Sequence, residues 1–112
     1  MTAATPVLTG KQKRFLRAQG HSLKPLLQVG QQGPGPAVVA QAQACLAAHE
    51  LVKVRVLESC PLEREACAQA LAQATGAAVA QVLGRTVLLY RPHPEAPLLR
   101  LPAAGARPPG EA

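Results

Sequence analysis

Within residues 51–57, Leu-Val-Lys-Val-Arg-Val-Leu, apolar and cationic side chains alternate with a period of two from Val52 to Val56. This period is typical of a β-strand whose two faces meet different surroundings. We therefore expect the three valines to face a core, and Lys53 and Arg55 to share the opposite face. Because the chain has 112 residues, we expect a single modest core with one compact domain around it.

The segments on either side of this strand have the spacing of helices. Residues 36–49 and 62–75 place apolar side chains three and four positions apart. A further helix, rich in basic residues, is expected over residues 10–19. Thr9 suits its N-cap, and Gly20 is expected to end it.

Short apolar runs at residues 25–29, 77–83 and 85–90 have the character of strands, and Gly84 marks a β-hairpin between the last two. The expected order of elements is therefore α-β-α-β-α-β-β. This order predicts an α/β fold of the α+β sandwich kind, in which a mixed four-stranded sheet is packed with three helices.

The ends of the chain differ from its middle. Residues 9–92 form the predicted domain, after a short N-terminal tail over residues 1–8. From residue 93 to 112 a proline recurs every few positions, and this C-terminal tail is expected to be largely disordered. The N-terminal tail lacks the features of a signal peptide, and no run approaches the roughly 20 apolar residues of a membrane span. We expect a cytoplasmic protein without membrane contact.

Positive charge gathers near the N-terminus. The formal net charge is +6, and residues 9–24 carry five basic side chains and no acidic one: Lys11, Lys13, Arg14, Arg17 and Lys24. A basic cluster without acidic partners attracts polyanions. With one Phe, one Tyr and no Trp, the chain lacks the aromatic platform on which RRM-type proteins stack bases.

The segment Gly30-Gln31-Gln32-Gly33 lies between a predicted strand and a predicted helix. Two glycines three positions apart let the backbone turn sharply and approach another backbone closely. The unpaired N–H groups at the start of the next helix would point to the same place, where phosphate is the natural occupant. The alternative interpretation is a tight strand-to-helix connection that binds nothing.

More specific chemical motifs are missing. The sequence contains neither GxxxxGK[ST] nor GxGxxG, which excludes a P-loop and argues against a dinucleotide fold. Its three cysteines are odd in number and have no CxxC spacing, so neither a metal site nor a disulfide framework is indicated. The histidines and glutamates do not assemble a nucleophile with a base. We expect no catalytic residues, no metal, no cofactor and no small-molecule substrate.

Several blocks of sequence, in order along the chain, resemble the CRM domain family, and in particular its bacterial single-domain members of the YhbY type. Together they span about residues 8–92. The blocks are residues 9–18, 20–25, 29–33, 49–56, 75–77, 81–85 and 87–92.

This resemblance implies an RNA-binding module with a fold similar to the C-terminal domain of translation initiation factor three. It further implies binding to 23S-type ribosomal RNA in precursors of the large ribosomal subunit during ribosome assembly. We expect a monomer, with ribosomal proteins as further partners. The family's GxxG loop is taken to contact RNA together with basic residues. The candidate RNA-binding residues are Lys11, Lys13, Arg14, Arg17, Lys24, Gly30, Gln31, Gln32, Gly33, Lys53, Arg55, Arg85 and Arg91.

Two features depart from the family pattern. The loop interior, Gln31-Gln32, lacks the basic residue that many members carry, and Pro34 and Pro36 remove two backbone donors at the start of the helix. We therefore expect the basic helix near residues 9–17 to contribute more to binding than the glycine loop. Two alternatives stay open: DNA binding, and a protein-interaction adaptor that docks on a ribosomal protein or assembly factor through the leucines of residues 98–101.

Overall fold

The computed structural model describes residues 7–93, so the two predicted tails lie almost entirely outside the described residues. The seven predicted elements are present in the predicted order. They are α1 (Gly10–His21), β1 (Leu27–Val29), α2 (Pro36–His49), β2 (Leu51–Val56), α3 (Arg64–Thr75), β3 (Ala78–Leu83) and β4 (Thr86–Tyr90).

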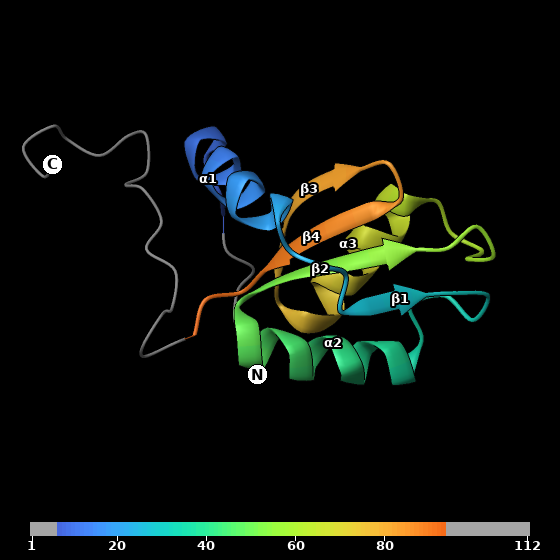
Figure 1. Cartoon of the computed structure of the whole chain (residues 1–112). Helices are drawn as coiled ribbons and strands as arrows, with labels where there is room; N and C mark the ends of the chain where they lie inside the picture. Colours follow the sequence, from blue (N-terminus) through green and yellow to red (C-terminus); the bar gives the residue numbers. More distant parts are fainter. Residues whose placement is uncertain (1–6, 94–112) are drawn as a thin grey trace, which may run out of the picture.

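The four strands form one mixed sheet in the order β1-β2-β4-β3 (Figure 1). β1 and β2 are parallel and are joined through α2, whereas β2 pairs with β4, and β4 with β3, in antiparallel fashion. The last two strands form the predicted hairpin: Leu83 lies opposite Thr86, and Gly84 takes a positive φ of 58° in the turn. The α+β fold with three helices and a mixed four-stranded sheet is thereby confirmed.

Helices α2 and α3 cover one face of the sheet, and α1 lies against the other (Figure 1). The valines of β2 face α2 and α3, where they are between 0% and 2% exposed, while Arg55 is exposed on the side of α1. The period-two prediction for this strand is confirmed. The main core contains Leu27, Val29, Ala42, Leu46, Val52, Val54, Val56, Cys67, Ala68, Leu71, Ala72, Ala77, Val87 and Leu89.

A smaller apolar cluster holds α1 on the sheet: Leu16, Leu51, Ala80, Leu88 and Tyr90, with Leu8 and Phe15 packed against it. The prediction that Gly20 ends the helix is wrong, since α1 continues to His21 with Ser22 as its C-cap. Gly20 is buried, and a Cβ placed on it would lie 2.6 Å from Leu88 Cδ1. Its missing side chain lets α1 approach the sheet closely.

Local signals set the other helix ends. Thr9 and Gln12 form a capping box, with each side chain bonded to the other residue's backbone N–H at 3.1 Å, as the predicted N-cap requires. α3 begins at Arg64, two residues later than predicted, and ends at Gly76, whose φ of 73° is left-handed.

The three cysteines are free thiols. Cys67 is fully buried in the main core, and Cys45 and Cys60 are partly buried against it. Burial, with a smaller contribution from the neighbouring Cys60, raises the pKa of Cys67 to about 12. The Cys67 thiol therefore stays protonated at neutral pH, which suits an apolar core position.

Glu50, between α2 and β2, is a buried carboxylate in a conformation unusual for a non-glycine residue, with φ at 60°. Its Oε2 accepts a hydrogen bond from the His93 backbone N–H at 2.6 Å, and its carbonyl oxygen accepts one from Arg91 N at 2.9 Å. Burial and the nearby Glu50 raise the pKa of Tyr90. Glu50 thus anchors the chain as it leaves β4.

Candidate nucleic-acid interface

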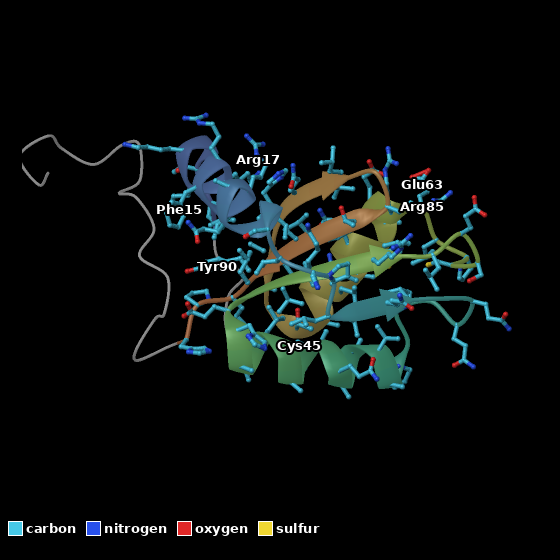
Figure 2. All side chains as sticks on the ribbon, viewed as in Figure 1. Phe15, Arg17, Cys45, Glu63, Arg85 and Tyr90 are labelled. Carbon is cyan, nitrogen blue, oxygen red and sulfur yellow. The ribbon has the colours of Figure 1, made fainter. Side chains whose placement is uncertain are left out.

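Helix α1 exposes its basic side chains to solvent. It buries Leu16 and Gly20 against the sheet, whereas Lys11, Lys13, Arg14 and Arg17 are all exposed. Figure 2 shows Arg17 and Phe15 on different sides of α1. Because the helix carries no acidic residue, these four charges have no counter-ion within their own element.

The basic surface continues onto the sheet face that α1 leaves uncovered. Gly20 covers Leu88, which lies opposite Lys53 on β2. Two positions further along β2, on the same face, Arg55 lies opposite Thr86 and is exposed. The exposed Lys24 follows α1 in the chain, and the Lys53 ammonium donates to the Leu23 carbonyl at 3.1 Å.

We call these seven cations the cationic face. Its members lie on α1, on the connection to β1 and on β2. They are Lys11, Lys13, Arg14, Arg17, Lys24, Lys53 and Arg55.

Acidic residues lie elsewhere. Of the glutamates in residues 7–93, Glu50 is buried, and the other three fall between residues 58 and 65, after β2 and at the start of α3. Glu58 pairs with Arg85 at 3.2 Å, and Glu65 with Arg64 at 3.5 Å. We call the region that carries Glu58, Glu63 and Glu65 the acidic corner. The separation of charge attracts a polyanion to the cationic face and repels it from the acidic corner.

The glycine loop lies at the opposite end of the sheet from α1 (Figure 1). Gly33 N donates to Gly30 O, and Gly35 N to Gly33 O, both at 2.9 Å. These two backbone N–H groups are therefore bonded within the loop and do not point to a ligand. Gly33 has a φ of 67°, and a Cβ on it would lie 3.4 Å from Pro61. The loop is therefore braced against the β2–α3 connection, next to the acidic corner.

The other predicted loop residues offer amide hydrogen bonds but no charge. Gln31 and Gln32 are exposed and uncharged. Pro36 occupies the first turn of α2, and Gly35 at the N-cap supplies no side-chain hydrogen bond. On β2, Lys53 lies next to Leu88 under α1, and Arg55 lies opposite Gln28, nearer to this loop, so the loop and the basic helix are not neighbours.

Arg85 and Arg91 are placed apart from the cationic face. Arg85 lies in the β3–β4 turn, at the end of the sheet away from α1 (Figure 2), and it is bonded to Glu58. Arg91 follows β4, and its guanidinium donates to Thr75 O at 2.7 Å and to the side-chain and backbone oxygens of Gln43. These bonds tie the end of β4 to α2 and α3 and give Arg91 a structural role.

Replacing Arg91 with Ala is expected to lower the free energy of unfolding by about 1–3 kcal/mol, because partly buried oxygens lose their donor. Urea titration measures this change. The matched control is Arg55→Ala, an exposed arginine, which is expected to change stability by at most about 0.5 kcal/mol. Equal stability of the two variants would contradict the role given to Arg91.

A hollow of about 530 Å³ lies beside the β3–β4 turn. It is lined by Val56, Leu57, Glu58, Cys60, Leu62, Glu63, Arg64, Glu65, Gly84 and Arg85. Its charged walls, Glu58, Glu63, Arg64, Glu65 and Arg85, sum to a small negative charge, which does not suit an anion. In the described part of the chain, no group of three or more His, Cys, Asp or Glu could hold a metal ion. No helix among these residues is long and apolar enough to cross a membrane.

The sequence is similar to a known domain and to known proteins. Residues 8–91 match the CRS1 / YhbY (CRM) domain. The "Probable RNA-binding protein YqeI" of Bacillus subtilis is 40% identical over 96 residues, which cover 86% of this chain and 100% of that protein. An "RNA-binding protein" of Haemophilus influenzae is 36% identical over 89 residues, covering 80% of this chain and 90% of that protein.

A solved structure has the same fold. The solution structure of the hypothetical protein SAV1595 from Staphylococcus aureus superposes with a TM-score of 0.74 at 35% identity, over 86% of this chain and 100% of that chain. The relatives are named for binding RNA and not for catalysis. The chain therefore belongs to the CRS1 / YhbY (CRM) domain family.

Proposed function

We propose that this protein binds ribosomal RNA in precursors of the large ribosomal subunit during ribosome assembly, as a cytoplasmic monomer without enzymatic activity. The observation that carries the proposal is the cationic face, which presents seven Lys and Arg side chains on elements free of acidic residues. The relatives named as RNA-binding proteins support the choice of RNA as the polyanion.

The physical basis of binding is the neutralisation of phosphates. Each Lys or Arg that contacts a phosphate releases condensed counter-ions, which favours binding at low salt and makes affinity salt-dependent. Phosphate contacts fix position and carry little sequence information. We therefore propose that most of the affinity comes from α1, Lys24 and β2, and that the glycine loop with Arg85 forms a weaker second contact.

The test is a fluorescence anisotropy titration with fragments of large-subunit ribosomal RNA and a matched DNA duplex, across a series of salt concentrations. The expected result is tighter binding to RNA, with a log–log salt slope that corresponds to about three to six phosphate contacts. Absence of binding to both polymers at low salt would refute the proposal. It would favour the adaptor, whose motivating leucines at residues 98–101 lie outside the described residues.

A further inference from the structure

A row of polar side chains crosses the uncovered half of the sheet. Arg55 on β2 lies opposite Gln28 on β1 and opposite Thr86 on β4. Residues paired in this way have side chains on the same face of a sheet, and adjacent strands lie about 4.8 Å apart. The row of Gln28, Arg55 and Thr86 therefore spans about 10 Å across three strands. We call it the polar row.

The polar row is accessible and has hydrogen-bonding capacity to spare. Gln28 and Arg55 are exposed. Unlike Arg85 and Arg91, the Arg55 guanidinium has no ion pair or hydrogen bond to any described residue. The Thr86 hydroxyl donates to Leu83 O at 2.8 Å, which leaves its oxygen free to accept. The row thus offers an amide, an unengaged guanidinium fork and a hydroxyl acceptor side by side.

The aromatic side chains of the protein are used for packing. Tyr90 is 3% exposed, and Phe15 packs against the apolar cluster under α1. The protein has no other aromatic residue. Single-stranded RNA is generally read by stacking splayed bases on exposed aromatic rings or Arg planes, and the polar row offers one arginine and no aromatic ring. The alternative is a nucleic acid whose bases stay stacked in a helix.

The width and the chemistry of the polar row together select the kind of helix. The minor groove of B-DNA is about 6 Å wide, too narrow to admit a surface of about 10 Å. Its major groove, about 12 Å wide, would admit the row but displays no 2′-hydroxyl. The minor groove of A-form RNA is wide and shallow, and it displays 2′-hydroxyls and base edges. These groups both donate and accept hydrogen bonds, which matches the chemistry of Gln28, Arg55 and Thr86.

We propose that the polar row contacts the minor groove of double-helical RNA, while α1 and Lys24 hold the adjoining phosphates. This inference rests on the proposed function and specifies its substrate as an A-form helix in place of single-stranded RNA. Gln28 and Thr86 are uncharged, and the inference nevertheless assigns to them a contact with the RNA minor groove. Arg55 supplies hydrogen bonds there in addition to charge.

The test compares three probes of one sequence: an RNA duplex, a DNA duplex and single-stranded RNA, measured by competition anisotropy at a fixed salt concentration. The intact protein is expected to prefer the RNA duplex over each of the others by about 10-fold. The variant Gln28→Ala/Arg55→Lys, which conserves the net charge, is expected to lose most of this preference while its affinity for DNA stays unchanged. Thr86→Val should lose part of it.

The control is Lys11→Gln, which removes one charge from α1 and is expected to weaken binding to both duplexes equally. If the double variant also weakens both duplexes equally, or if single-stranded RNA binds more tightly than the duplex, the inference about the polar row is overturned and RNA binding as such stands. If no RNA probe binds, including ribosomal RNA fragments, the proposed function itself fails. The measurement thus distinguishes the two failures.

Discussion

Removal of the four basic side chains of α1, each replaced by Gln, is expected to weaken RNA binding about 100-fold at about 0.1 M salt. The slope of log affinity against log salt should become less steep by about three to four. The reason is that each phosphate contact contributes about 0.7–0.9 to the steepness through the counter-ions that it releases, and four contacts are lost. The helix itself should persist, since Gln has a helix propensity close to that of Lys and Arg. The four residues are Lys11, Lys13, Arg14 and Arg17.

Anisotropy across a salt series measures both quantities, and circular dichroism checks that α1 still folds. The matched control is Arg64→Gln, which removes a charge at the acidic corner, beside Glu65. Per charge removed, this control is expected to change affinity and slope far less. Unchanged binding by the α1 variant, or an equal loss per charge in the control, would show that net charge and not the cationic face governs binding.

Substitution of Gly20 by Ala is expected to lower the free energy of unfolding by about 1–3 kcal/mol, the usual cost of overpacking. The sign is opposite to that at an ordinary helix position, where Ala is favoured over Gly by about 1 kcal/mol. The reason is that a Cβ at Gly20 would lie 2.6 Å from Leu88 Cδ1 and 2.7 Å from Leu88 Cδ2. Either Leu88 must leave its rotamer or α1 must rise from the sheet.

Thermal unfolding measures this effect, since about 1 kcal/mol corresponds to about 4–8 °C in Tm for a domain of this size. The control is Gly10→Ala at the start of the same helix, where the nearest atom to the new Cβ is Arg14 Nη1 at 3.7 Å. This control should be neutral or slightly stabilising. Shortening the opposing side chain in Gly20→Ala/Leu88→Val should recover part of the loss. A Gly20→Ala variant as stable as the intact protein would refute the close-approach explanation.

The local elements followed from the sequence because short-range physics specifies them. Thr9 caps α1 through a residue three positions away, Gly76 ends α3 because it tolerates a left-handed conformation, and the alternation over residues 51–57 already separates two faces. These signals act within about four residues. The likeness to the C-terminal domain of translation initiation factor three, the domain bounds 9–92 and the disorder of residues 93–112 stay predictions.

The composition of the candidate surface depended on tertiary structure. The sequence grouped Arg91 with the other cations, yet in the fold its guanidinium meets oxygens of Gln43 and Thr75, respectively 48 and 16 positions away. The glycine loop, which the resemblance led us to expect at the RNA together with the basic residues, lies at the far end of the sheet from α1. Neither fact has a signal within a few residues of the position concerned.

The sequence by itself determined the helices and most of their ends, the strands, the positions that face the core and the unequal distribution of charge. Only the tertiary structure decided which charges share a face, why Gly20 is a glycine, and that Gln28, Arg55 and Thr86 form one row. The physical reason is that periodicity and capping are local, whereas strand order and register bring together residues 27 and 31 positions apart. A surface built across strands therefore exists only after the sheet has formed.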